Sequence, residues 1–383
     1  PSFESFTKIV KSMLKNRENG KLSVLSMDVG KCISSISYFF NDAKWNPSEL
    51  KNAVQEHILK SADTKIHQGD IASVDGSSIS KKGDAFEFIG DVWDNADKCT
   101  KSGYEYIAVA IISPIKKQKR LFDWLICSNQ HPKFLSYPLY TQRLLKRLFA
   151  HAKEIKTIVF DSGFKNQYTM NLMLKEGKNF IIRALPDMKL WEDGYKGKKE
   201  YGYDFNKIEK MPNARSFELE INGKQGWKIT WGSGIVNAWM NEIKIPLTVI
   251  IIKHPVFRNP LVLITNLEPA NYIEAYEVYE TYRQRWKIEQ IFQSIKELGL
   301  EKFRVRKYKA IIRYLTIMFV VHSMLNWQTA YLQARIKLRA MIKTLLQKKR
   351  KIQDVLIGGV KIFYELYLQK TITLRDLFSY EIT

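Results

Sequence analysis

Residues 68–185 carry the pattern that most restricts the fold of this chain, because strand-like and helix-like segments follow one another there in a definite order. Three strand-like segments separated by turn-rich loops come first: DIASVDG, GYEYIAVAIIS and RLFDWLICS. A helix-like segment, a buried strand, a second helix-like segment and a last strand follow: LYTQRLLKRLFAHAKEI, TIVFD, NQYTMNLMLKEG and KNFIIRAL. Three strands, helix, strand, helix and strand predict a mixed α/β layer architecture.

Four further regions surround this core, whose first part we place at residues 63–185. Residues 1–62 carry apolar side chains at helical spacing, which fits either a small DNA-binding unit or a plain helical scaffold. Residues 186–267 alternate in short runs between Gly, Pro and Asn, which predicts a mostly β insertion. Residues 268–307 return to helix and are predicted to complete the core, and residues 308–383 are predicted to form a helical C-terminal region.

The net charge of +22 over 383 residues is the strongest compositional signal. Each phosphate that Lys or Arg neutralises releases condensed counterions, so a chain this basic is expected to bind a polyanion. An anionic membrane surface would also attract it, but we expect no membrane span. The most apolar run, residues 315–327, is too short and contains His322. Nucleic acid is therefore the predicted partner.

Several other classes of protein and site are not indicated. No signal peptide is recognised at the start of the sequence. The three cysteines, Cys32, Cys99 and Cys127, lie far apart without metal-ligand spacing, which fits a reducing cytoplasm. No Walker motif and no GxGxxG follows a predicted strand, so no nucleotide cofactor is expected.

Three carboxylates are the candidates for chemistry. Asp75 ends the first predicted strand, and Asp161 ends the strand that follows the first helix. Both precede glycine-containing turns, where Asp is also favoured for capping. Carboxylates at the ends of two neighbouring strands can face one crevice, however, and that is where α/β sheets usually bind ligands. Glu289, on a helix packed across the sheet, would complete an all-oxygen cluster.

Such a cluster suits Mg²⁺, with Mn²⁺ as a substitute, because both ions prefer hard carboxylate ligands and retain water. Two ions about 4 Å apart can activate an attacking water or 3′-hydroxyl and stabilise the leaving oxygen. This is phosphodiester chemistry, and the charge of +22 points to the matching substrate.

The stretch YRQRWKIEQIFQSIK, residues 282–296, reads as the helix that carries Glu289. At 3.6 residues per turn, Tyr282, Arg285, Glu289 and Lys296 fall within roughly 60° of arc, away from the apolar face. A solvated face with ion pairs worth tenths of a kcal/mol is one reading. Beside a metal site, Arg285 and Lys296 would instead hold phosphates of the strand being cut, and Tyr282 would donate a hydrogen bond to another phosphate.

The spacing Y-x2-R-x3-E-x6-K resembles the YREK signature of DDE transposases from bacterial insertion sequences. The neighbouring segments are similar too: SISYFFNDAKWNPSEL, VDGSSISKKG, FDSGF followed by FIIR, and LITNLEP before RWKIEQIFQSIKELGLEKFRVR. The resemblance thus covers most of the chain.

The resemblance implies an RNase H-like core, interrupted by the β insertion, in which Asp75, Asp161 and Glu289 hold two Mg²⁺ ions. It implies cut-and-paste transposition in the bacterial cytoplasm, with hydrolysis at terminal inverted repeats and joining of the 3′-OH to target DNA. A dimer on double-stranded DNA is also implied, with the helical region beyond residue 308 as a candidate interface. Three cations that follow the signature are further candidates for DNA binding: Arg304, Arg306 and Lys307.

The sequence departs from the family at one position. Some relatives make a hairpin on the transposon end and hold a flipped base on a Trp at the start of the strand that corresponds to PLVLITN. Residues 260–262 of this chain, Pro-Leu-Val, contain no Trp. Phe257, Trp231 or Trp239 could substitute, although each fits a core position as well.

Two other functions remain open from the sequence. A DNA-binding relic or repressor that no longer cuts is disfavoured by the presence of all three acids and both signature cations. An RNase H-like nuclease without a joining step shares the acids, but the N-terminal helices and the β insertion favour synapsis. Lys81 and Lys82, shortly after the first acid, fit either a DNA contact or a solvated loop.

Overall fold

The computed structural model describes most of the chain in two compact units. The described residues are 3–15, 21–83, 85–94, 97–184, 189–190, 203–221, 224–237, 244–253 and 259–336. Unit 1 comprises Pro1–His67, Gly76–Ser136 and Ile288–Thr383, and unit 2 comprises Gln68–Asp75 and Tyr137–Lys287.

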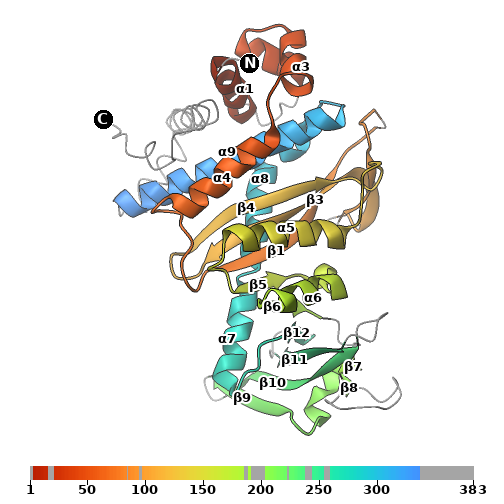
Figure 1. Ribbon diagram of the computed structural model, residues 1–383, viewed down its shortest axis with the longest axis vertical. Coiled ribbons are helices and arrows are strands. Elements are labelled where there is room, and N and C mark those ends of the chain that lie inside the picture. The colour runs from red at the N-terminus through yellow and green to blue at the C-terminus, as the bar shows by residue number, and fades with distance from the viewer. Residues whose placement is uncertain are drawn as a thin grey trace. The chain divides into compact units, whose positions relative to one another are not determined.

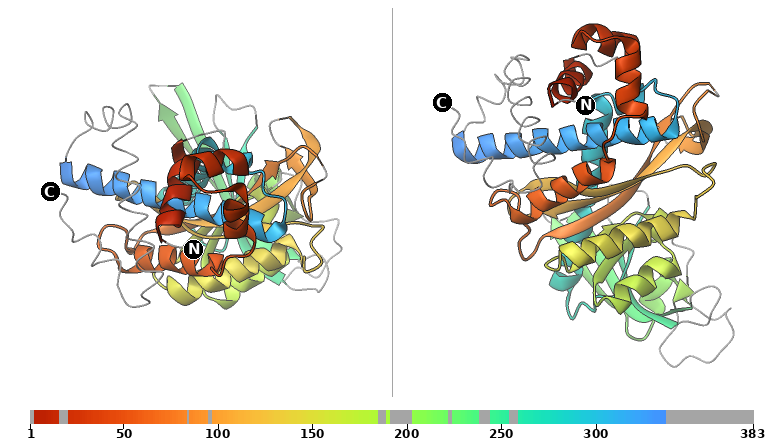
Figure 2. Two further views of the ribbon diagram at one scale, coloured as in Figure 1. Left: turned by 90° about the horizontal axis from the view of Figure 1, so that it is seen from above. Right: turned by 45° about the horizontal axis from the view of Figure 1, so that its top comes forward.

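Four helices of unit 1 lie within the region expected to be helical at the front of the chain. They are α1 (Phe3–Lys15), α2 (Leu22–Val29), α3 (Ile33–Asn41) and α4 (Pro47–Lys60). The residues at the start of α4 determine where the helix begins. The Asn46 side chain accepts a hydrogen bond from the Ser48 amide. Pro47 occupies the first turn, where a backbone N–H would have no partner within the helix, so its missing N–H costs nothing. Figure 2 shows α1 to α3, in red and orange, gathered beside α9 (Tyr308–Ile336).

The long helix α9 ties this region together. Arg313 is 3% exposed and donates hydrogen bonds to the carbonyls of Phe40, Ala43 and Trp45, so its guanidinium satisfies the end of α3 and the loop before α4. Beyond Ile336, the rest of the predicted helical C-terminal region, residues 337–383, lies outside the described residues.

Unit 1 also contains antiparallel strands. They are β2 (Gly90–Asp94), β3 (Cys99–Ser113), β4 (Gln118–Cys127) and the second half of β1 (Ile71–Ser80). Strand β3 pairs with β2 and β4, and it approaches β1 at Gly103, where a Cβ would lie 2.3 Å from the Ile79 carbonyl oxygen. Helices α4 and α9 run side by side against β4 (Figure 1).

The core of unit 1 is aromatic. Tyr106 of β3 packs against Phe292 of α8 (Trp286–Glu297) at 5.0 Å and against Phe319 of α9 at 5.2 Å between ring centroids. Residues Tyr308–Trp327 of α9 are long and apolar enough to cross a membrane, judged by length and composition alone. The shorter run of residues 315–327 that we considered in the sequence did not indicate this. Since 83% of the apolar stretch of α9 is buried within the protein, it packs as a core helix.

Unit 2 is built on a mixed sheet. Its strands pair in the order β1, β5 (Thr157–Phe160), β6 (Asn179–Arg183), β12 (Leu261–Thr265), β11 (Lys244–Lys253), β10 (Lys224–Asn237) and β9 (Arg215–Ile221). The first three are parallel and the rest antiparallel. Its helices are α5 (Tyr137–His151), α6 (Gln167–Lys175) and α7 (Tyr272–Arg283). The expected mixed-sheet α/β architecture is thus confirmed.

The strands of the insertion extend the core sheet. The contact is made by β12, whose residues Leu263, Ile264 and Thr265 pair antiparallel with Arg183, Ile182 and Ile181 of β6. A separate two-stranded ribbon is formed by β7 (Lys189–Leu190) and β8 (Tyr203–Asp204). In Figure 1 the strands of unit 2 lie beside α7.

The prediction of one continuous helix over residues 282–296 is wrong. Helix α7 ends at Arg283 and α8 begins at Trp286, with a turn at Gln284 and Arg285. The Arg285 amide donates to the Tyr282 carbonyl rather than to a carbonyl four residues back. No glycine or proline marks this break, so periodicity alone reads through it.

Candidate active site

Asp75 and Asp161 lie at equivalent positions of two neighbouring parallel strands in unit 2. In the register of β1 and β5, Val74 pairs with Phe160, and the two acids are the next residue on each strand. The sequence predicted that Asp75 ends the first strand. That prediction is wrong, because β1 continues to Ser80. The pairing of β1 with β5 ends there instead, so both carboxylates follow the last paired residues.

The capping role of Asp161 is not realised. Asp161 precedes a short 3₁₀ turn, Ser162–Phe164, and its side chain makes no capping hydrogen bond to that turn. The side chain is half-buried and stands at the edge where ligands of α/β sheets usually bind. Asp161 therefore does not act as the cap of the turn that follows it.

Arg285 contacts the first acid directly. Its Nη1 donates a hydrogen bond to Asp75 Oδ2 at 2.9 Å, and the two side chains are only 13% and 14% exposed. The guanidinium carbon also lies 5.8 Å from the centre of the Tyr282 ring. The sequence predicted a phosphate contact for Arg285, and it gave no sign of this carboxylate partner.

Tyr282 belongs to the same cluster. It is 7% exposed, and burial raises the pKa of its hydroxyl above the ordinary value. Arg285 opposes this shift of the pKa, whereas the negative charge of Asp161 adds to it. Unit 2 therefore brings together four of the predicted residues: Asp75, Asp161, Tyr282 and Arg285.

Glu289 lies in α8, four residues after Arg285, and its side chain is half-buried. The apolar face expected for this helix is present, since Ile288, Ile291, Phe292 and Ile295 are all buried. Glu289 falls in unit 1, whereas the other two acids fall in unit 2.

The donors in unit 2 fit a divalent cation. Asp75 and Asp161 supply the hard carboxylate oxygens that Mg²⁺ prefers, at the carboxyl ends of adjacent parallel strands. Within the described part of the chain, no three His, Cys, Asp or Glu side chains are grouped so that they could hold a metal ion. The cation site that unit 2 supports by itself thus has two protein carboxylates.

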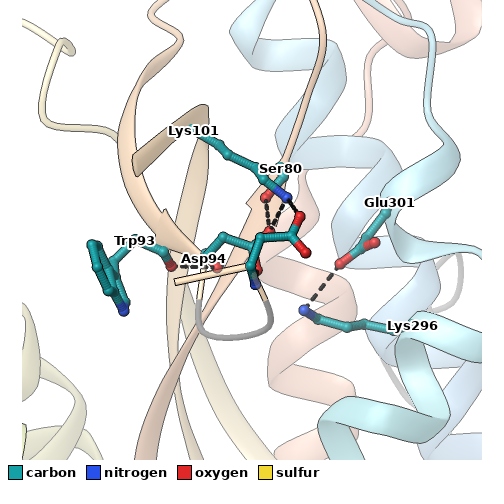
Figure 3. Close-up of polar contacts among 8 residues, drawn as sticks. Ser80, Trp93, Asp94, Lys101, Lys296 and Glu301 are labelled. Carbon is teal, nitrogen blue, oxygen red and sulfur yellow. Dashed lines mark hydrogen bonds and ion pairs between the residues drawn. The ribbon is translucent and has the colours of Figure 1, made fainter. Parts of the chain in front are cut away.

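Lys296, the last member of the signature, is paired as well. Its Nζ lies 3.0 Å from Glu301 Oε1, and both side chains are more than a third exposed (Figure 3). Figure 3 also shows Asp94, which accepts hydrogen bonds from Ser80 and from Lys101. An ion pair as exposed as Lys296–Glu301 contributes little to stability, about 0–1 kcal/mol, so it opens easily.

The segment after α8 exposes the three further cations. Arg304, Arg306 and Lys307 point to solvent, while Phe303 and Val305 between them are buried. This alternation fixes one side of the segment in the core and presents the charges on the other. The exposure is what a DNA contact requires, although DNA contact itself stays a prediction.

Lys81 takes neither of the roles expected from the sequence. Its ammonium donates to the carbonyls of Glu301 and Phe303 at 2.6 and 2.7 Å and lies 3.8 Å from the centre of the Phe303 ring. Burial, followed by the charge of Arg304, lowers the pKa of Lys81 to about 8. Lys81 therefore anchors the segment that carries the exposed cations, whereas Lys82 is exposed.

A pocket of 470 Å³ opens beside the signature residues of unit 2. Its lining includes Leu261, Tyr279, Tyr282, Arg285 and Trp286. Trp286 is 59% exposed, which is unusual for the largest apolar side chain. Sequence reasoning missed it, and the available signal was a Trp directly after Arg285 on a helix whose apolar face lies elsewhere.

The substitutes considered for the absent Trp have different outcomes. Trp231 is 6% exposed and donates from Nε1 to the Pro269 carbonyl, so it is a core residue. Trp239 and Phe257 lie outside the described residues. Leu261, in the position where a Trp was sought, lines the same pocket as Trp286.

Residues 137–324 match the family model of the transposase DDE domain. The matched stretch contains Asp161 and the whole signature from Tyr282 to Lys296, and Asp75 lies before it. No curated protein matches the chain.

Two solved structures are similar at low identity. A piggyBac transposase synaptic complex with hairpin DNA is 12% identical, with a TM-score of 0.46, over 98% of this chain and 74% of that one. Endonuclease V of Ciona intestinalis, in complex with a 24mer DNA containing an inosine followed by a ribo-adenosine, is 13% identical, with a TM-score of 0.22, over 55% and 80%.

Proposed function

We propose that the protein cuts DNA at the terminal inverted repeats of a transposable element and joins the freed 3′-OH to target DNA, because residues 137–324 match the family model of the transposase DDE domain. The observation that carries the proposal is the placement of Asp75 and Asp161 at the matched carboxyl ends of parallel strands, beside Arg285 and Tyr282. The net charge of +22 supports DNA as the substrate.

Asp75, Asp161 and Glu289 would hold two Mg²⁺ ions. Bound in this way, the ions supply an activated water or 3′-hydroxyl and a stabilised leaving oxygen. The carboxylates would orient the reacting phosphate through these ions, and the buried face of α8 would hold the Glu289 backbone in place.

The cations of the signature would bind the DNA backbone. Arg285 suits a phosphate because its planar guanidinium offers two parallel donors, and Lys296 can leave its exposed partner at little cost. The Tyr282 hydroxyl would donate a hydrogen bond to a phosphate, because a tyrosine is protonated at neutral pH and burial raises the pKa of this one further. Arg304, Arg306 and Lys307 would extend the contact along the duplex.

A hairpin intermediate is the finer part of the proposal. It requires a place for an unpaired base, and the 470 Å³ pocket offers the exposed ring of Trp286 beside the Arg285 guanidinium. An aromatic surface next to a cation is suited to a base with its phosphate, because stacking tolerates any base. The protein would act as a dimer on DNA in the bacterial cytoplasm.

The test uses the full chain with a plasmid that carries the element encoding it, in Mg²⁺, beside Asp161→Asn and Glu289→Gln. We expect the parent to release the element ends on a denaturing gel and both variants to be inactive while still retarding DNA in a mobility-shift assay. Binding without cleavage by the parent, in Mg²⁺ and in Mn²⁺, would leave a DNA-binding relic. Cleavage without joined products would leave a nuclease.

A further inference from the structure

The ion pair between Arg285 and Asp75 places a positive charge where the proposed cation site needs an open carboxylate. Asp75 Oδ2 accepts the hydrogen bond from Arg285 Nη1 at 2.9 Å, inside a region where each side chain is about one-seventh exposed. A charge this far from water requires a partner, so the two side chains hold each other in the absence of DNA.

Arg285 and a divalent cation compete for Asp75. The guanidinium already occupies one of the two oxygens that the cation needs, and two positive charges at one carboxylate repel each other in a region with little solvent to screen them. Arg285 makes its hydrogen bond to Asp75, and the competition therefore concerns that carboxylate.

Arg285 also reaches a second environment. It lines the 470 Å³ pocket together with the exposed Trp286, and this pocket is open to solvent. A phosphate that enters the pocket offers Arg285 a new anionic partner with two acceptor oxygens, which a guanidinium binds in parallel.

We propose that Arg285 is exchanged between Asp75 and a DNA phosphate, so that Asp75 becomes available to a divalent cation only after DNA has entered the pocket. This inference rests on the proposed function. It makes the order of assembly DNA first and metal second, and it prevents a metal-loaded site from acting on stray phosphodiesters.

The experiment maps metal occupancy without relying on DNA cleavage. Fe²⁺ replaces Mg²⁺ in the full chain, and ascorbate with hydrogen peroxide then cuts the polypeptide next to the bound ion. Fragments ending near residues 75 and 161 are measured by mass spectrometry. The proteins are the parent, Arg285→Gln, the charge-retaining Arg285→Lys, and Arg283→Gln as the matched control. Arg283 lies at the end of α7, two residues before Arg285, and its guanidinium pairs with Glu280 at 2.7 Å.

Without DNA, we expect cleavage near residue 75 to be at least several-fold stronger in Arg285→Gln than in the parent. Arg283→Gln and Arg285→Lys should stay near the parent, which separates loss of the cation from a general loosening of the fold. In the parent, a duplex with the terminal sequence of the element that encodes this chain should raise cleavage near residue 75 towards the level of Arg285→Gln.

Equal cleavage in the parent and in Arg285→Gln overturns the inference, and so does a parent that does not respond to the duplex. Strong cleavage in Arg285→Lys overturns it as well, because a retained cation should keep the site closed. A parent that fails these tests yet releases element ends in Mg²⁺ leaves the proposed function standing. A parent that passes them without cutting DNA removes the proposed function alone.

Discussion

The ammonium of Lys81 lies 3.8 Å from the centre of the Phe303 ring, so a cation directly after β1 is packed against the segment that follows α8. Two carbonyl acceptors, those of Glu301 and Phe303, complete its surroundings. The contact is long-range in sequence and lies wholly within unit 1. It explains how a loop of charged residues is held in one conformation.

Replacing Lys81 by Met should therefore destabilise the protein. The substitution leaves two carbonyls without their donor, and unsatisfied buried groups cost about 1–3 kcal/mol each, less here because the site is partly hydrated. We expect a loss of about 1–3 kcal/mol in the free energy of unfolding by denaturant. Lys82→Met, at the exposed neighbour, should change it by less than about 0.5 kcal/mol, and equal losses would refute the anchor.

Two buried histidines predict sensitivity to acid. Burial lowers the pKa of His57 to about 3 and that of His322 to about 3, with Lys119 contributing at His322. The unfolded chain binds these protons near pH 6.5, so stability is complete above that pH and is lost as the pH falls towards 3. At pH 5 each histidine costs about 2 kcal/mol.

His57→Phe should reduce this loss. The phenyl ring can keep the contact with Trp327, whose ring centre lies 4.1 Å from that of His57, and it cannot take up a proton. The melting temperature of the variant should fall less steeply than that of the parent between pH 6.5 and 4. Parallel curves for the two proteins would contradict the assignment.

Arg313→Lys should not behave as a conservative change. The guanidinium donates to three carbonyls and lies 4.7 Å from the Trp45 ring centre, an arrangement that a single ammonium cannot reproduce. We expect a loss of about 2–4 kcal/mol in unfolding free energy, measured by chemical denaturation. Lys309→Arg, on the same helix, provides the control, and a similar loss there would point to a general effect.

Trp286→Ala should weaken the hold on an unpaired base. Stacking on an aromatic ring contributes about 1–3 kcal/mol per base, so binding of an element end with a fluorescent 2-aminopurine near its terminus should weaken accordingly, and the rise in fluorescence should be lost. Trp286→Phe should retain most of the effect. Trp93→Ala removes another exposed Trp, in β2 of unit 1, and an equal loss there would argue against the pocket.

Much of the fold could be predicted because the helices and strands follow from local sequence patterns. The order of strands and helices over residues 68–185 and the helices of residues 1–62 follow from periodicity and turn residues. Strand β2 was not foreseen, since GDVWD is short and bounded by charged loops. The pairing of β12 with β6 could not be read either, because a pairing partner distant in sequence leaves no local mark.

The sequence could predict which residues belong to the candidate site, but it could not predict which side chains contact one another. The matched positions of Asp75 and Asp161 followed from the strand ends, and the register supports them. The turn at Gln284 and Arg285 interrupts the helix that was used to place Arg285 and Lys296 on one face, so that angular argument holds only within α8. The partners of Arg285, Lys296 and Lys81 are carboxylates and carbonyls that no spacing rule indicates.

The antiparallel pairing of β12 with β6 has a consequence for any shortened form of the protein. Strand β6 is flanked by β5 on one side and by the insertion on the other, so it has no free edge. Deleting residues 186–267 would expose its amide and carbonyl groups one strand away from Asp161. An uncovered edge recruits strands from other chains. By covering the edge of β6, the insertion is expected to protect the protein against aggregation. A shortened protein without the insertion should therefore aggregate.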